Sequence, residues 1–344
     1  MTNRQKNLLA FAATIFVFSI IALAIYNKKP SEIKYTRPLM GTIVEITLIG
    51  KNEALLNAAA EAAFAEIKRL EGLMSHYRED SDVTKINNAA GKEPVAISNE
   101  TMEVIEASLK ASQTTYGAFD ISMGVLGKAW HFIKDDKGEL TPPSKEDVKK
   151  LLPLIDYRQI IIDKESNKVK LAKEGMKINL GGVAKGYIVG KAAEVLKKNG
   201  IKRGMVHAGG DMIVFNEPDS PPRLIGIQDP RNKDNIIGTL KVSNTTVATS
   251  GDYERFFVKD GKRYHHIMDP STGFPANKSI TATMVTKDPT LADALSTAVF
   301  IMGPESGMKL IEELPGVEGL IIRADGKLTM SSGFKEIYTP GTKQ

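Results

Sequence analysis

The sequence of 344 residues contains no cysteine. This absence excludes disulfides, thiolate zinc sites, iron–sulfur clusters, a cysteine nucleophile and a lipid-modified cysteine. Any metal ion must therefore be held by oxygen or imidazole ligands, and histidine is scarce too, with five residues. The 29 glycines and 16 prolines are too few for a collagenous chain, while 42% hydrophobic and 25% charged residues are typical of a globular protein with a substantial core.

An excess of charge of one sign is also nearly absent once the amino terminus is set aside. The formal net charge is +5, but residues 1–29 hold four basic residues and no acidic one. The rest of the chain therefore carries 42 basic against 41 acidic residues. Nucleic-acid binding needs basic residues concentrated on one folded face. We therefore expect no nucleic-acid partner, and we interpret the basic amino terminus as a signal for membrane orientation.

One long apolar run is present, over residues 8–26, and it approaches the ~20 residues that a helix needs to span a bilayer. Arg4 and Lys6 precede it, so the positive-inside rule places the following chain outside the cytoplasm. An Ala-x-Ala sequence ending at Ala24 also fits a signal-peptidase site. We expect a membrane-anchored protein, or a secreted soluble form if the chain is cleaved after Ala24.

Helical and strand patterns fall in separate clusters along the chain, which favours an α+β fold over a regular βαβ alternation. We expect one compact domain of mixed sheets and helices over residues 30–344, behind a transmembrane or signal segment over residues 1–29. The predicted helices cover residues 53–75, 99–116, 144–153, 182–198, 291–302 and 305–314. Ser98 is expected to be the N-cap of the second of these helices. Strands are expected over residues 35–49, 160–163, 168–171 and 176–180, through much of 204–287, and near the carboxyl end.

The segment Asn179-Leu-Gly-Gly-Val-Ala-Lys-Gly-Tyr187 joins a predicted strand end, a double glycine and a helix start. Backbone N–H groups at a helix amino terminus bind phosphate, and Lys185 would add a positive charge. The segment matches neither a Walker A motif nor G-x-G-x-x-G. Phosphate binding and an ordinary tight turn therefore both remain open at this point.

The segment Thr290-Leu-Ala-Asp-Ala-Leu-Ser-Thr297 places a carboxylate and a hydroxyl four residues apart on a predicted helix. Asp293 and Thr297 then emerge on one face, and oxygen ligands of this kind suit Mg²⁺. Thr290 and Asp293 also fit a capping box, in which Asp293 would only satisfy backbone donors. The spacing alone leaves both interpretations open.

Four further segments have a structural and a functional interpretation. The pair His265-His266 sits on a predicted strand, so the two rings point to opposite faces and at most one of them enters a given pocket. An aromatic and a carboxylate stand together at Phe119-Asp120, a combination that suits a stacked heterocycle, although the residues alone favour Phe119 as an ordinary core side chain. Met40-Gly41-Thr42 and His76-Tyr77 are undecided in the same way.

Taken in order, these segments resemble the ApbE family of FAD:protein FMN transferases over about residues 35–340. Each motif is weak by itself, whereas the ordered set is specific. The motifs are Pro38–Thr42, Ser75–Tyr77, Gly117–Ile121, Asn179–Tyr187, Ala208–Asp211, Thr249–Tyr253, His266–Pro270 and Ala292–Thr297. The resemblance implies an ApbE-like (T-fold-like) domain that transfers FMN from FAD to a threonine hydroxyl of an acceptor protein, releases AMP and depends on Mg²⁺, with Mn²⁺ as a possible substitute.

The resemblance also implies roles for individual residues. The residues that would hold FAD are Met40, Tyr77, Ala118, Phe119, Asp120, Asn179, Lys185 and Ile267. Asp293, Thr297 and the backbone carbonyl of Gly182 would bind the metal ion, and His266 would activate the acceptor hydroxyl. At position 179 this chain has asparagine where the family commonly has aspartate.

The expected partners are FAD and an acceptor protein, typically an extracytoplasmic subunit of a membrane redox complex such as sodium-translocating NADH:quinone oxidoreductase or an Rnf-type complex. Two alternatives stay open. The same metal site would serve an FAD pyrophosphatase that gives FMN and AMP, and the set of FAD-contact positions would also fit a noncatalytic extracytoplasmic flavin-binding protein.

Overall fold

A computed structural model describes residues 29–130 and 140–341, together with isolated positions before residue 17. The predicted membrane segment over residues 8–26 lies almost wholly outside the described residues. Within the part of the chain that is described, no helix is long and apolar enough to cross a bilayer.

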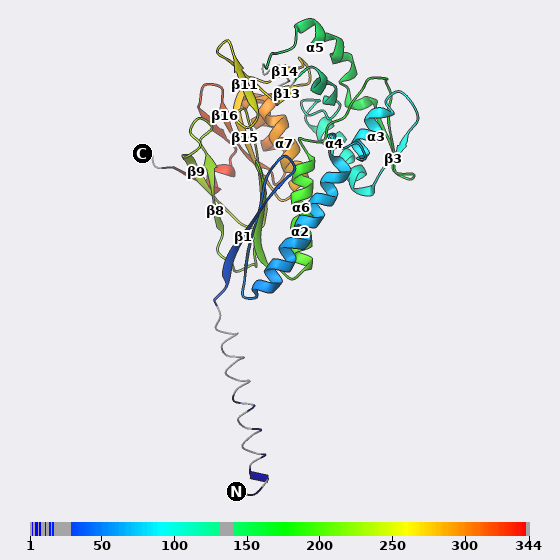
Figure 1. Ribbon diagram of the computed structural model, residues 1–344. Coiled ribbons are helices and arrows are strands. Elements are labelled where there is room, and N and C mark those ends of the chain that lie inside the picture. The colour runs from blue at the N-terminus through cyan, green and yellow to red at the C-terminus, as the bar shows by residue number, and fades with distance from the viewer. Residues whose placement is uncertain are drawn as a thin grey trace.

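An eight-stranded antiparallel sheet forms the centre of the fold (Figure 1). Its strand order is β1-β2-β6-β7-β10-β15-β16-β17, which combines the hairpins β1–β2, β6–β7 and β16–β17 with pairings between strands distant in the sequence. Every residue of β15 is buried, because helices cover one face of the sheet and a smaller sheet covers the other. The strands are β1 (Ser31–Leu39), β2 (Thr42–Gly50), β6 (Arg203–Ala208), β7 (Asp211–Phe215), β10 (Thr245–Gly251), β15 (Ser279–Thr286), β16 (Glu318–Arg323) and β17 (Leu328–Met330).

Helices α2, α6, α7 and α8 cover one face of this sheet. Three buried alanines of α2, Ala59, Ala60 and Ala63, carry small side chains that allow close packing against neighbouring elements. In α6, Gly186 and Gly190 lie directly against Pro289 of α7. The helices are α2 (Glu53–Met74), α3 (Asp82–Asn88), α4 (Asn99–Thr114), α5 (Lys145–Leu151), α6 (Ala184–Lys198), α7 (Pro289–Met302), α8 (Pro304–Glu313) and α9 (Phe334–Ile337), with 3₁₀ turns at Gly124–Lys128, Leu152–Leu154 and Tyr157–Gln159.

A three-stranded sheet in the order β18-β9-β8 packs on the opposite face of the large sheet. The apolar layer between them contains Val214, Val247 and Leu320 from the large sheet, and Leu240 from the small one. The remaining strands form a three-stranded sheet and two short hairpins. Their bounds are β8 (Arg223–Gln228), β9 (Ile236–Val242) and β18 (Tyr338–Pro340); β3 (Val95–Ala96), β4 (Ile160–Asp163) and β5 (Lys168–Leu171); and β11 (Phe256–Lys259), β12 (Lys262–His265), β13 (Met268–Asp269) and β14 (Phe274–Pro275).

The α+β architecture predicted from the sequence is confirmed. The predicted N-cap at Ser98 is also correct, since its hydroxyl accepts the N–H of Thr101. The predicted strand over residues 176–180 is wrong: only Lys177 makes an isolated bridge there, to Met123. The first strand begins at Ser31, four residues before its predicted start at residue 35.

The contact of α6 with α7 gives a test of the packing. A Cβ at Gly186 would lie 2.1 Å from the carbonyl oxygen of Pro289 and 2.8 Å from Cβ of Asp293. We expect Gly186→Ala to lower the free energy of unfolding by about 1–3 kcal/mol, because the two helices must separate. Urea unfolding followed by circular dichroism measures the change.

Gly72→Ala is the matched control, because this glycine lies inside α2 and its added methyl group would approach nothing closer than 3.9 Å. Alanine has the higher helix propensity, so this variant should gain up to about 1 kcal/mol. Equal effects at the two positions would contradict the packing argument.

Candidate functional site

Asp293 lies in the buried interior of α7 and faces the first turn of α6. The N-cap of α7 is Asp288, whose carboxylate accepts the N–H groups of Thr290 and Leu291. The helix begins at Pro289, so the capping-box interpretation of Thr290 and Asp293 is wrong. Instead, Asp293 Oδ2 accepts the backbone N–H of Gly186 at 2.9 Å, across the interface between the two helices.

Lys185 lies between two buried carboxylates. Its Nζ pairs with Asp211 at the start of β7 and lies 3.8 Å from Asp293 Oδ1. Burial would lower the pKa of Lys185, but the charges of Asp211 and Asp293 outweigh burial and raise it, so the ammonium is charged at neutral pH. Burial, followed by the charge of Asp211, raises the pKa of Asp293 to about 7. The Lys185 ammonium is thus the positive group close to two buried carboxylates, those of Asp211 (1% exposed) and Asp293 (2% exposed).

Thr297 lies one helical turn after Asp293 and on the same face of α7. Its hydroxyl is 3.2 Å from Ser250 Oγ at the end of β10. A Cβ at Gly182 would lie 3.3 Å from Thr297 Oγ1 and 3.3 Å from the ring of Phe119. The double glycine therefore brings the backbone close to both the hydroxyl and the aromatic ring, as a predicted metal-binding carbonyl at Gly182 requires.

The donor set at this point fits a hard divalent cation. Asp293 Oδ1 has Lys185 at 3.8 Å, which is beyond hydrogen-bonding distance, and Thr297 adds a hydroxyl oxygen on the same helix face. Among the described residues, no three His, Cys, Asp or Glu side chains are grouped so that they could hold a metal. Mg²⁺ is usually bound by one or two carboxylates, waters and substrate phosphates, so a sparse oxygen site is compatible with it.

His266 lies at the base of the hairpin formed by β11 and β12. Its side chain is exposed, whereas the adjacent His265 is buried and contacts the carbonyl of Ala276 through Nε2 at 2.8 Å. The predicted opposite orientation of the two histidines is therefore confirmed. Surrounding protein atoms partly desolvate the ring, and together with the charge of Arg255 they lower the pKa of His266, so the ring is neutral at pH 7.

Met40 occupies the two-residue turn between β1 and β2. Met40 and Gly41 both have positive φ angles, of 55° and 66°, which is the conformation of a type I′ hairpin turn. An open pocket of about 540 Å³ lies along this turn, and Glu71 of α2 also lines it. Tyr77, just after α2, is 72% exposed, and its ring centroid is 3.9 Å from that of His76.

Phe119 and Asp120 form part of the loop after α4. Both oxygens of Asp120 are engaged within the protein: Oδ1 accepts the N–H and hydroxyl of Ser122, and Oδ2 accepts the N–H of Tyr157 at 2.9 Å. The Asp120 side chain therefore holds this loop in place, and burial raises its pKa. Asn179 Oδ1 accepts the N–H of Gly181 at 2.8 Å, which shapes the double-glycine turn.

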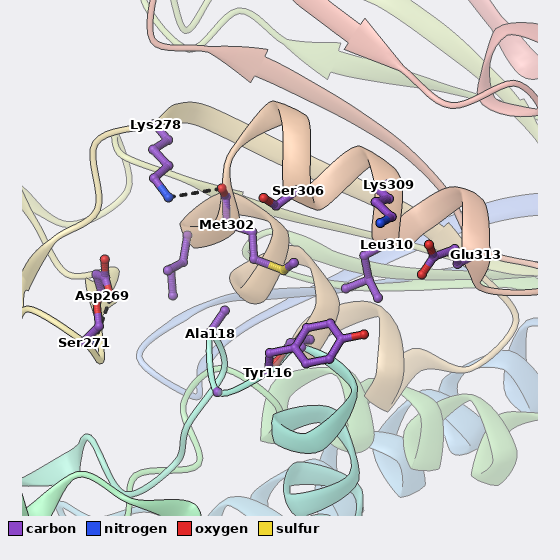
Figure 2. Close-up of a pocket in the computed structure, with 13 residues that line it drawn as sticks. Tyr116, Ala118, Asp269, Ser271, Lys278, Met302, Ser306, Lys309, Leu310 and Glu313 are labelled. Atoms are coloured by element: carbon purple, nitrogen blue, oxygen red, sulfur yellow. Dashed lines mark hydrogen bonds between the residues drawn. The ribbon is translucent and has the colours of Figure 1, made fainter.

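A larger pocket, of about 600 Å³, adjoins these residues (Figure 2). Ala118 forms part of one wall, and Ile301 and Met302 at the end of α7 form another. Ile301 is one turn beyond Thr297 and shares the face of α7 that carries Asp293. Figure 2 also shows Lys309 and Glu313 of α8 along the edge opposite Asp269. The pocket therefore reaches α7 at Ile301 and Met302, beyond Thr297.

The structure brings part of the predicted set of residues close together. Lys185, Gly182, Asp293 and Thr297 form the centre, and the charge of Lys185 also acts on His266. Ile267 is buried beside His266 and hydrogen-bonds through its carbonyl to the N–H of Ala276. Contacts of the predicted FAD residues with a nucleotide stay predictions.

Three residues of this site had no assigned role at the sequence level: Asp211, Ser250 and Arg255. Asp211 and Ser250 lie inside the motifs Ala208–Asp211 and Thr249–Tyr253. The motifs therefore indicate that these positions matter, but they do not predict which side chains the two residues contact. Pairing of Lys185 with Asp211 joins residues 26 positions apart. No local spacing rule connects them, because the sheet and not the helix determines where Asp211 lies.

Comparison with known proteins identifies a matching family, relatives that are similar in sequence, and solved structures that are similar in fold. A family model described as the ApbE family matches residues 40–321. A protein of Klebsiella pneumoniae named FAD:protein FMN transferase is 30% identical over 308 residues, which cover 89% of this chain and 94% of that protein. A protein of Treponema pallidum with the same name is 32% identical over 315 residues, which cover 86% of each chain.

Two solved structures have a fold similar to that of this chain. The ApbE protein of Thermotoga maritima has a TM-score of 0.83 and 35% sequence identity, and the match covers 89% of this chain and 99% of that one. The flavin transferase ApbE of Vibrio cholerae has a TM-score of 0.78 and 28% identity, with coverage of 90% and 99%.

The raised pKa of Asp293 predicts an unusual pH dependence of stability. Between the ordinary pKa of an aspartate and about 7, the folded protein holds a proton on Asp293 that the unfolded chain has lost. Stability from this residue is therefore lost as the pH rises through 7. We expect Asp293→Asn, measured with a chelator present, to be more stable than the parent protein at pH 8 by about 1 kcal/mol or more, and to lose that advantage at pH 4.

Asp288→Asn is the matched control on the same helix. Asparagine caps a helix about as well as aspartate, so its stability should change by less than about 0.5 kcal/mol at either pH. A difference between Asp293→Asn and the parent that stays constant from pH 4 to pH 8 would show that the carboxylate is not destabilised by its surroundings.

Proposed function

The chain belongs to the ApbE family, and from that membership we propose that it is an FAD:protein FMN transferase. Its substrate is FAD, and its second substrate is a hydroxyl group of an acceptor protein, which we propose to be a threonine. The observation that carries the proposal is the meeting of Lys185, Asp293 and Thr297 beside a double-glycine turn, within a fold that matches the flavin transferases over most of its length.

The reaction is a direct displacement at phosphorus. The acceptor oxygen forms a bond to the FMN phosphorus of FAD, the pyrophosphate P–O bond breaks, and AMP leaves with the electron pair of that bond. The acceptor hydroxyl loses its proton to a base, because a neutral hydroxyl is a poor nucleophile. His266 is exposed and neutral at pH 7, so it can receive this proton.

The Gly186 N–H at the start of α6 is taken by Asp293. We propose that the Lys185 ammonium is the group of this turn that stabilises negative charge on the pyrophosphate oxygens. Asp211 contributes indirectly, since it keeps the Lys185 ammonium charged and limits its conformations. We propose that Asp293, Thr297 and the Gly182 carbonyl hold Mg²⁺, or Mn²⁺. When bound, such a cation supplies further neutralisation of the same oxygens.

FAD is proposed to lie between the two pockets. Ala118 borders the larger pocket, and the buried ring of Phe119 lies against Gly182. Met40 lines the smaller pocket beside Gly41, which Arg255 contacts. Asn179 and Asp120 support this path through the turns that their side chains hold. Tyr77 offers an exposed ring against which a flavin can stack.

The transfer can be tested with the full chain, FAD, Mg²⁺ and the extracytoplasmic domain of a redox-pump subunit as acceptor. We expect an FMN phosphoester on a threonine of the acceptor, found by mass spectrometry, and one AMP released per modification. His266→Ala should lower the transfer rate by about 100-fold or more while FAD affinity stays within about threefold. Asp293→Ala or a chelator should stop the reaction.

Leu224→Ala is the control, because this exposed side chain lies on β8 in the small sheet and should leave the rate unchanged. Release of AMP and free FMN without a labelled acceptor would identify an FAD pyrophosphatase instead. Binding of one FAD without turnover in the parent protein would identify a noncatalytic flavin-binding protein.

We also propose that residues 1–29 anchor the protein in a membrane with the catalytic domain outside the cytoplasm, where subunits of membrane redox complexes present their acceptor domains. The support is the apolar run over residues 8–26 and the basic residues on either side of it. Cell fractionation tests the anchor: the chain should remain with the membrane after a high-salt wash, whereas a chain starting at residue 25 in the soluble fraction would indicate cleavage after Ala24.

A further inference from the structure

Arg255 connects the hairpin that carries His266 to the turn that carries Met40. It immediately precedes β11, and its backbone carbonyl accepts the backbone N–H of His266 at 3.1 Å. The same carbonyl lies 3.3 Å from Nδ1 of the His266 ring. The Arg255 guanidinium donates to the carbonyl oxygen of Gly41 at 3.2 Å.

The contact with the carbonyl determines which nitrogen of His266 carries the proton. A carbonyl oxygen only accepts hydrogen bonds, so Nδ1 must be the N–H group of the neutral ring. The lone pair of the neutral imidazole is then on Nε2, on the side away from Arg255. Histidines that act as bases are commonly oriented by a hydrogen bond of this kind from the other ring nitrogen.

The guanidinium keeps this carbonyl in place. The β1–β2 turn is a type I′ turn whose backbone is fixed by two positive φ angles, so the Gly41 carbonyl is a rigid anchor. Arg255 is otherwise exposed at the open end of its hairpin. Without the anchor, the carbonyl that holds His266 would depend on the hairpin alone, whose own backbone turn at Asp260-Gly261 lies at the opposite end.

We propose that Arg255 is a positioning residue for His266: its carbonyl fixes the ring with Nε2 free, and its guanidinium ties that arrangement to the β1–β2 turn. The proposal rests on the proposed transferase function and extends it. It links the residue expected to take the acceptor proton with the turn expected to contact the flavin nucleotide. The charged and titratable groups that act on His266 are Arg255 and His265 from the hairpin and Lys185 from α6.

The test compares Arg255→Ala and Arg255→Lys with Arg263→Ala. Arg263 is the matched control, since it belongs to the same hairpin and its guanidinium stacks on Phe256 at 3.8 Å without a contact to Gly41. The first readout is ¹⁵N NMR of labelled histidine side chains in the full chain, with His266 assigned from the spectrum of His266→Gln. The second is kcat and KM for FAD in the transfer assay above.

In the parent protein and in Arg263→Ala, we expect His266 to be the Nδ1–H tautomer at pH 7.5. Arg255→Ala should shift it toward the mixed tautomers of a free histidine and lower kcat about tenfold, with less than a threefold change in KM for FAD. Arg255→Lys keeps one donor for Gly41 and should retain more than half of kcat. The acidic limb of the pH–rate profile should move to higher pH in Arg255→Ala, because a positive charge near His266 is lost.

An unchanged tautomer together with unchanged kcat in Arg255→Ala would overturn the proposal. So would an equal loss in Arg263→Ala, which would indicate a general effect on the hairpin. If Arg255→Ala does not fold, as judged by circular dichroism, Arg255→Lys and the tautomer of the parent protein decide the question. Absence of FMN transfer by the parent protein would refute the proposed function alone, since the NMR comparison does not need turnover.

Discussion

The close approach of α6 to α7 is the constraint on which the rest of the site depends. Gly186 has no side chain, and this allows its N–H to reach Asp293 at 2.9 Å while Pro289 lies against the same turn. A buried carboxylate placed in this way needs a positive partner, and Lys185 from the adjacent position supplies it. The helix interface thus determines both where the carboxylate lies and how strongly its ionisation is disfavoured.

The large sheet places the remaining groups around this interface. Asp211 begins β7 and Ser250 lies near the end of β10, and these two neighbouring strands pair at Asp211 and Ala248. Strand order therefore brings a carboxylate to Lys185 and a hydroxyl to Thr297 from segments that are distant in sequence. The hairpin after β10 then carries His266 back toward the same end of the helical layer. Helices and strands carry Lys185, Asp211, Ser250, Asp293 and Thr297, whereas Asn179, Gly182 and His266 lie in connections between elements.

Local sequence patterns correctly predicted features that depend only on neighbouring residues, such as helices and their caps. The helix at residues 99–114 and its N-cap Ser98 follow from periodicity and capping preference, and both are correct. Residues 176–180 have strand-like apolar side chains, yet they form no strand, because the segment packs beneath the loop after α4, where Asn179 N–H bonds the carbonyl of Ile121. The capping interpretation of Asp293 failed because Asp288, two residues before Thr290, is the better cap and starts the helix earlier. Pairings such as Lys185 with Asp211 depend on the strand order, which no motif spacing contains.

The hydrogen bond from Arg255 to Gly41 joins residues 214 positions apart, and the bond from Gly186 to Asp293 joins residues 107 positions apart. Strand β2 likewise pairs with β6 across the five α-helices described between them, α2 to α6. Long-range closures of this kind are slow steps in folding, since chain entropy is lost before the contacts form. A chain that is still emerging during synthesis or export therefore has helices α2 to α6 but neither Asp293 nor the Arg255 anchor. Its site can be completed only after more than four fifths of the sequence is present, so an incomplete chain has no finished site to occupy.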